Sequence, residues 1–205
     1  MQRALKVLLF SAALVPAAYL AYRLYYGDLG ANPAETLQLD TGTWGLRFLV
    51  ATLAVTPLRR LTGWNRVIQY RRMLGLFAFF YATLHLATYV VLDRYFDFKG
   101  IWGDIAKRPF ITMGMIAFAL MVPLALTSTK GWIRRLGKRW QLLHRLVYVS
   151  GIAAAVHYLW KVKVAVGAPV YYAVVIGALL AFRVYWSLRR KATVRVTSPV
   201  ARPQS

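Results

Sequence analysis

The chain has 205 residues, a formal net charge of +21 and a hydrophobic fraction of 59%. This apolar content is too high for a soluble domain of this length, so the composition predicts an integral membrane protein. The absence of cysteine excludes disulfides, zinc–thiolate sites and iron–sulfur clusters. The sequence also shows no glycine-rich phosphate loop and no nucleotide-binding domain.

Six runs are long and apolar enough to cross about 30 Å of hydrocarbon as helices. In chain order they are approximately Lys6–Tyr26, Thr43–Leu58, Met73–Leu92, Pro109–Leu126, Gln141–Trp160 and Pro169–Leu188. The second run is short and extends back toward Leu39. Pro109 and Pro169 suit the first turn of a helix, whereas Pro16 should bend the first helix. We therefore predict an all-α, polytopic bundle of six transmembrane helices, and we find no internal repeat.

The charged residues orient this bundle. Most of the 27 lysines and arginines lie before the first run, between the second and third, between the fourth and fifth, and after the sixth. All six acidic residues lie in or beside the three opposite connections: Asp28, Glu35, Asp40, Asp93, Asp97 and Asp104. Because basic loops stay in the cytoplasm, we expect a bacterial inner-membrane protein with both termini cytoplasmic. Basic residues in such short loops indicate contact with anionic membrane lipid and no nucleic acid.

We expect residues 1–190 to form one membrane domain and residues 191–205 to form a disordered cytoplasmic tail, because the tail is polar and basic.

All three histidines fall inside the apolar runs, His85 in the third run and His144 and His157 in the fifth. A histidine at membrane depth is costly and often functional, although it can also simply hydrogen-bond neighbouring helices. The absence of an intramembrane carboxylate disfavours a proton path and favours metal or cofactor ligation. Haem iron accepts neutral imidazole from two facing helices.

The third and fifth runs both begin at the cytoplasmic side, so a rise of 1.5 Å per residue places His85 about 18 Å deep and His157 about 24 Å deep. We predict that these two residues are the axial ligands of one b-type haem, held between the third and fifth helices. His144 lies about 20 Å nearer the cytoplasm, and the equivalent position of the third run is Arg72, which cannot ligate iron. His144 stays a possible third ligand, but a second haem held by two histidines is not supported. His144 and His157 share a face only if the helix is distorted, near Gly151.

Arg71, Arg72, His144 and Arg145 gather at the predicted cytoplasmic boundary. Guanidinium groups suit phosphate, carboxylate or propionate, so this group is a candidate site for an anion or a redox partner. The usual excess of cytoplasmic arginine explains Arg71 and Arg72 equally well.

Four runs resemble the ferric-reductase-like transmembrane superfamily, and within it the haem-binding membrane subunits of periplasmic methionine-sulfoxide reductase systems. They are TGTWGLRFLVATLAVTPLRR (Thr41–Arg60), RRMLGLFAFFYATLHLATYVVLD (Arg71–Asp93), KRPFITMGMIAFALMVPLALTS (Lys107–Ser128) and LGKRWQLLHRLVYVSGIAAAVHYLWKVK (Leu136–Lys163). The resemblance covers about residues 1–190. It implies that the family's cofactor-binding residues correspond to His85, His144, His157, Arg71 and Arg72.

The resemblance also implies a function. Electrons would pass from the quinone pool, or from a cytosolic flavin reductase, through haem b to a periplasmic molybdopterin subunit of the MsrP type, which repairs methionine sulfoxide in periplasmic proteins. The chain would then deliver electrons within a heterodimer and perform no substrate chemistry of its own. FMN is a further implied cofactor, which we expect near Arg71, Arg72 and the basic loop 130–139.

One departure from the superfamily pattern and two alternative functions stay open. Two-haem members of the superfamily carry two histidines on each of two helices, whereas the third run here contains only one. A ferric or other metal reductase would use the same haem with a different acceptor. A membrane transporter that uses the histidines as a relay is an alternative from a different functional class. The absence of intramembrane carboxylates disfavours it.

Overall fold

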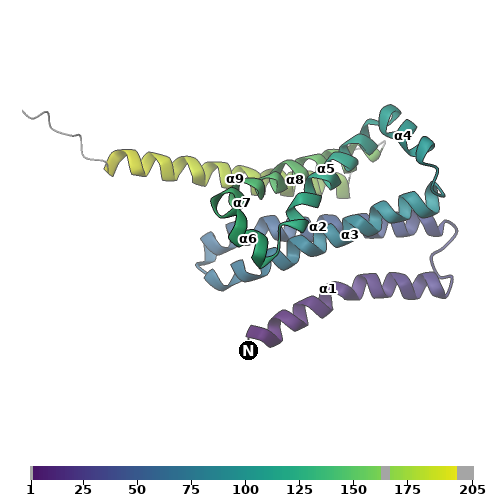
Figure 1. The fold of residues 1–205 in the computed structure, drawn as a ribbon, viewed down its shortest axis with the longest axis horizontal. Helices are drawn as coiled ribbons and strands as arrows, with labels where there is room; N and C mark the ends of the chain where they lie inside the picture. The colour runs from purple at the N-terminus through teal and green to yellow at the C-terminus, as the bar shows by residue number, and fades with distance from the viewer. Residues whose placement is uncertain (1, 163–166, 198–205) are drawn as a thin grey trace, which may run out of the picture.

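A computed structural model describes residues 2–162 and 167–197, and these residues form helices and connections with no strand (Figure 1). The long helices are α1 (Gln2–Tyr25), α2 (Pro33–Thr62), α3 (Arg71–Thr88), α5 (Pro109–Leu126), α8 (Leu146–Lys161) and α9 (Ala168–Thr197). Shorter segments are the 3₁₀ helix η1 (Asn65–Tyr70), the π-helix η2 (Tyr89–Asp93), α4 (Phe98–Lys107), α6 (Lys130–Leu136) and α7 (Lys138–Leu143).

Five helical segments among the described residues are long and apolar enough to cross a membrane. They are Arg3–Tyr25, Asn65–Asp93, Pro109–Leu126, Lys138–Lys161 and Ala168–Arg189. The remaining predicted span falls in α2, which has 30 residues but contains Asp40, Arg47 and several threonines, so its apolar content is lower. The prediction of an all-helical membrane protein is confirmed, with five candidate spans.

The C-terminal helix is longer than expected. α9 continues through Thr197 and so includes residues 191–197, which were predicted to belong to the tail. Residues 198–205, the remainder of that predicted tail, lie outside the described residues.

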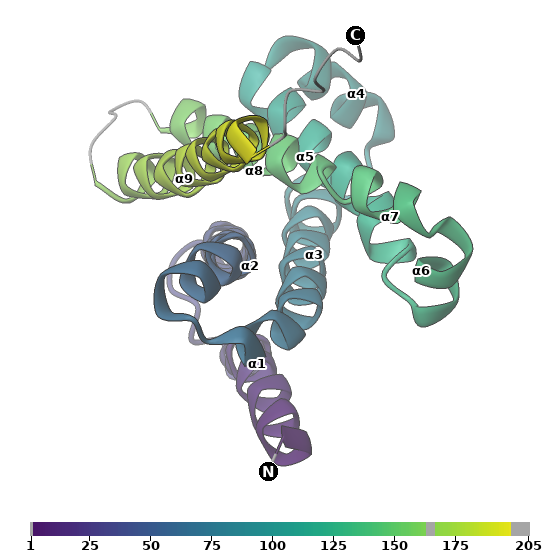
Figure 2. The same cartoon turned by 90° about the vertical axis from the view of Figure 1, so that its left-hand side faces the viewer.

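Successive long helices run in opposite directions, which gives the bundle two ends (Figure 1). At one end lie the α1–α2 connection, α4 and the end of α8, together with all six acidic residues; we call it the acidic end. At the other, basic end lie η1, α6 and α7. Within the bundle α2 packs along α3 and α5 packs along α8, while α9 contacts both α2 and α8 (Figure 2). The core where these helices meet contains Leu46, Leu49, Leu53, Ala78, Met121, Val147 and Ile176.

α1 lies outside this core and is bent, as Pro16 predicts (Figure 1). Next to the proline, the hydroxyl of Tyr81 donates to the Ala13 carbonyl oxygen at 2.7 Å and accepts from the Ala17 N–H at 3.1 Å. These two backbone groups would bond each other in a regular helix, so the hydroxyl is inserted into the helical ladder. Tyr81 is fully buried, and it fastens α1 to α3 at this point.

Candidate functional site

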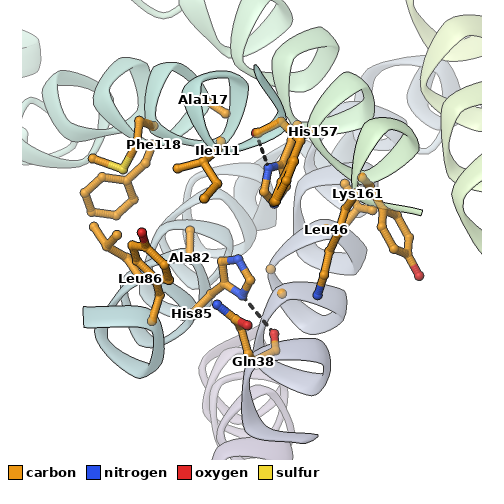
Figure 3. A pocket seen from close by; sticks show the side chains of 18 of the residues that line it. Gln38, Leu46, Ala82, His85, Leu86, Ile111, Ala117, Phe118, His157 and Lys161 are labelled. Atoms are coloured by element: carbon orange, nitrogen blue, oxygen red, sulfur yellow. Dashed lines mark hydrogen bonds between the residues drawn. The ribbon is translucent and has the colours of Figure 1, made fainter. Parts of the chain in front are cut away.

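A cavity of about 310 Å³ lies toward the acidic end, between the α2–α3 pair and the α5–α8 pair (Figure 3). Small and apolar side chains form most of its wall: Ala78, Ala82, Ala117, Ala154, Leu46, Leu49, Ile111 and Phe118. Polar side chains line it as well: Gln38, Tyr89, Asp93, Arg108, Tyr158 and Lys161. The small residues leave room for a broad, flat group, and the polar ones could bind its charged substituents.

His85 from α3 and His157 from α8 face each other in this cavity. Their ring centres are 6.0 Å apart and their planes make an angle of 79°. The structure therefore brings together the two histidines that the sequence predicts to act as a pair.

A backbone carbonyl fixes the tautomer of each ring. His85 Nδ1 lies 2.8 Å from the Gln38 carbonyl oxygen, and His157 Nδ1 lies 2.6 Å from that of Phe110 (Figure 3). Because a carbonyl oxygen can only accept, Nδ1 carries the proton in both rings, and Nε2 of each neutral imidazole keeps its lone pair. Metal-ligating histidines usually donate their other N–H in this way.

Two glycines make these hydrogen bonds possible. A Cβ atom on Gly42 would lie 2.9 Å from His85 Nδ1, and one on Gly114 would lie 2.7 Å from His157 Nδ1. Both distances are shorter than nonbonded contacts allow. Each imidazole can therefore lie against the neighbouring helix only because that helix has glycine at the point of contact.

The two helix pairs repeat one arrangement. Gln38, Gly42 and His85 in the first pair match Phe110, Gly114 and His157 in the second, each 72 residues later, and both hydrogen bonds span 47 residues. The sequence shows no internal repeat, so this match is one of geometry. The side chains around these positions differ, and only the shared glycine–histidine spacing could have revealed the match.

The distance between the His85 and His157 rings suits a metal ion whose other ligands come from a cofactor. An atom bonded to both Nε2 nitrogens would hold the ring centres about 6 Å apart, because metal–imidazole bonds are about 2 Å long and each nitrogen is about 1 Å from its ring centre. The described part of the chain contains no group of three or more His, Cys, Asp or Glu that could hold a metal. A porphyrin iron, which needs only two protein ligands, fits this donor set.

A cluster of charged groups ties α4 to the mouth of the cavity. The Tyr89 hydroxyl donates to Asp104 Oδ2 at 2.6 Å, Arg94 donates to the same oxygen, and Arg108 Nε lies 3.3 Å from Oδ1. Desolvation, the largest single influence, raises the pKa of Asp104, but the Tyr89 hydrogen bond and the charges of Arg108 and Arg94 outweigh it. The pKa of Asp104 is therefore lowered, and the carboxylate is held in its charged form.

The positive charge of Lys161 also reaches the cavity. Lys161 lies one turn beyond His157 on α8, and its side chain lines the cavity in Figure 3. Its charge acts on His85 and His157, and is attracted by Glu35 and Asp93.

His144 lies apart from this site, at the basic end. It follows the last residue of α7, its Nδ1 is 3.1 Å from the Trp140 carbonyl oxygen, and its ring stacks on Trp140 at 3.8 Å. A distortion near Gly151, the condition under which His144 and His157 would share a face of one helix, does not occur: α8 is continuous there, and the helical segment is interrupted at His144 and Arg145 instead. His144 thus lies in the turn between α7 and α8, whereas His157 lies on α8.

Arg71 and Arg72 differ in their burial. Arg71 begins α3, is partly buried, and is near enough for its charge to act on His144, whereas Arg72 is exposed. Neither arginine lines the cavity of His85 and His157. A cofactor-binding role for His144, Arg71 and Arg72 stays a prediction.

Several residues of the cavity could not be recognised from sequence. Gln38 and Phe110 act through their backbone carbonyls, which carry no residue-type signal. Gly42 and Gly114 read as ordinary packing glycines until their neighbours are known. Lys161 lies just beyond the predicted fifth run, where a lysine is typical of a membrane boundary.

Comparison with known proteins agrees with this geometry. The family model described as "Ferric reductase like transmembrane component" matches residues 41–155. A Rhodospirillum rubrum protein is 48% identical over 194 residues, covering 94% of this chain and 93% of that protein. A Herminiimonas arsenicoxydans protein is 49% identical (92% and 88% covered), and an Azospira oryzae protein is 50% identical (98% and 88% covered). All three are named protein-methionine-sulfoxide reductase heme-binding subunit MsrQ. No solved structure matches the chain.

Replacing Asp104 by Asn should destabilise the protein at neutral pH, by about 1–3 kcal/mol, because Arg94, Arg108 and Tyr89 lose their charged acceptor. The folded-state pKa of Asp104 is lowered, so its contribution is present above the pKa of the unfolded chain and is lost as the pH falls through the folded-state pKa. Thermal unfolding in detergent between pH 8 and pH 3 should show the two melting temperatures converging in acid.

The matched control is Asp28→Asn. Asp28 is exposed and its carboxylate lies as far as 3.8 Å from the Arg23 guanidinium, and such a surface pair contributes little to stability. A difference between wild type and Asp104→Asn that stayed constant down to pH 3 would show that the carboxylate charge is not responsible.

Proposed function

Since this chain belongs to the MsrQ family of ferric reductase like transmembrane components, we propose that it is the haem-binding, electron-transferring membrane subunit of a protein-methionine-sulfoxide reductase. The observation that carries the proposal is the pair of neutral imidazoles whose ring centres lie 6.0 Å apart in an apolar cavity. Two such rings can bind one haem iron through Nε2, and the surrounding small residues leave space for the porphyrin.

In this proposal α2 completes a bundle of six transmembrane helices within residues 1–190, and one haem b lies between the third and fifth of them, α3 and α8. The confinement of all six acidic residues to the acidic end supports an inner-membrane orientation with both termini and the basic end in the cytoplasm. The haem site then lies toward the periplasmic side.

A bound haem would supply reversible one-electron chemistry. His85 and His157 would hold the iron, and the carbonyls of Gln38 and Phe110 keep both rings in the tautomer that could ligate it. Arg108 and Lys161 offer positive charge for carboxylate substituents at the cavity mouth. The apolar wall excludes water, so nearby charges act strongly on the site.

Electrons would enter from the quinone pool, or from a cytosolic flavin reductase, and leave at the acidic end to a periplasmic molybdopterin subunit of the MsrP type. FMN would bind at the basic end, where Arg71 and His144 lie. The family also leaves a metal reductase as an alternative, which keeps the haem and changes only the acceptor. Activity of the reconstituted complex on oxidised methionine distinguishes the two acceptors.

The direct test is the reduced-minus-oxidised visible spectrum, with a pyridine haemochrome count per polypeptide. His85→Ala and His157→Ala should each lose most of the b-type signal, because one axial ligand is removed. His144→Ala should keep it, since His144 lies at the other end of the bundle. Loss of about half the haem in His144→Ala would instead establish a second haem, and no chromophore in haem-supplemented wild type would refute the proposal.

Gly114→Ala should weaken haem binding although Gly114 is not itself a proposed iron ligand. The added methyl group would force His157 off the Phe110 carbonyl, and loss of such a supporting hydrogen bond costs about 10–100-fold in metal affinity. Haem titration of the apoprotein measures the change. Gly177→Ala is the matched control, because its new Cβ would have nothing within 4 Å; equal losses in both variants would contradict the steric explanation.

Lys161→Gln should lower the midpoint potential of the haem, on the order of tens of millivolts, because a nearby positive charge favours the reduced state. Redox titration followed in the visible spectrum measures the potential. Lys161→Arg keeps the charge and should stay close to wild type, and the exposed Lys107→Gln controls for surface charge. An unchanged potential in Lys161→Gln would rule out this electrostatic role.

A further inference from the structure

A cluster of three arginines lies at the basic side of the core, away from the histidine cavity. Arg60 is near the end of α2, Arg71 begins α3, and Arg183 lies in the middle of α9. The charges of Arg60 and Arg71 both act on Arg183. The Arg60 guanidinium also lies 5.3 Å from the ring centre of Trp186, one turn beyond Arg183 on α9. We call these three residues the arginine cluster.

The position of Arg183 has a local structural cause. Pro57 has no N–H, so the carbonyl of Leu53, four residues earlier in α2, lacks its helical donor. One terminal nitrogen of Arg183 donates to this oxygen at 2.9 Å, and the other donates to the Tyr148 hydroxyl at 2.6 Å. Both partners are neutral acceptors. They orient the guanidinium group without neutralising its charge.

The described helices that carry the arginine cluster supply no counter-charge to it. α3, α8 and α9 contain no acidic residue, and the two acids of α2, Glu35 and Asp40, lie in its first third at the acidic end. Among the described residues, the Nε of Arg183 is buried and has no hydrogen-bond partner. Cations held close together among apolar helices are costly unless an anion compensates them.

We propose that the arginine cluster binds the phosphate group of a molecule held at the cytoplasmic side of the membrane. Guanidinium groups match the charge and fork geometry of phosphate, and the inner leaflet is where anionic phosphates are concentrated. The assignment uses the membrane orientation given above, but it does not need the haem. It also replaces the exposed Arg72 of the sequence hypothesis with Arg60 and Arg183.

Two sources could supply this phosphate, the headgroup of an anionic phospholipid or the phosphate of FMN. The test titrates the purified full-length protein in detergent with short-chain phosphatidylglycerol, with phosphatidylcholine, and separately with FMN. Native mass spectrometry counts bound molecules, and melting temperature reports occupancy. Arg60 and Arg71 are the residues to change, because Arg183 also tethers three helices.

Arg60→Gln and Arg71→Gln should each weaken phosphatidylglycerol binding about tenfold, equivalent to about 1.4 kcal/mol. Arg72→Gln, which removes the same charge from an exposed neighbour, should change it by no more than about twofold. The same arginine dependence for FMN, with phosphatidylglycerol bound no better than phosphatidylcholine, would support the cluster and identify the flavin as the source.

Equal weakening by Arg72→Gln and Arg71→Gln would overturn the proposal, because it would show unspecific attraction to a basic surface. Binding of neither phosphatidylglycerol nor FMN in preference to phosphatidylcholine would overturn it as well. Haem spectra of the same samples separate the two proposals, since loss of the chromophore bears on the function and loss of phosphate binding bears on the cluster.

Discussion

The hydrogen bond between each imidazole Nδ1–H and a backbone carbonyl of the adjacent helix is the constraint on which the site depends. It fixes the tautomer, turns Nε2 of both rings into a potential ligand, and sets the distance between paired helices. Gly42 and Gly114 follow from it, because a side chain there would occupy the space of the ring. The same hydrogen bond appears in both helix pairs, so the two halves of the cavity share one local arrangement of histidine, glycine and carbonyl.

The two ends of the bundle handle charge in opposite ways. Near the cavity, Asp104 compensates Arg94 and Arg108, and Glu35 and Asp93 attract Lys161. The basic end has arginines and no acid, so any compensation there must come from outside the chain. Positive charge is therefore balanced beside the histidine cavity at one end, and at the other end it can attract an anionic molecule.

The sequence predicts well what depends on composition and spacing. The apolar runs locate the long helices, Pro16 locates the bend in α1, and the helical rise places His85 and His157 at similar depth. It fails where backbone atoms or close approaches decide the structure. The carbonyls of Gln38 and Phe110 and the Leu53 carbonyl released by Pro57 become informative only once distant helices are known to lie beside them. Arg183 is not among the predicted site residues, because a single arginine near the end of an apolar run is typical of the membrane boundary.

The pairing of helices has a consequence for the stability of the protein in the cell membrane. Packing is far more extensive within the α2–α3 and α5–α8 pairs than between them, and the cavity lies in the seam. A ligand bound by one histidine from each pair would join the two halves, so its binding energy would add directly to their cohesion. Haem supply would then govern how much of the protein survives membrane quality control, and cells short of haem would lose the subunit itself as well as its redox centre.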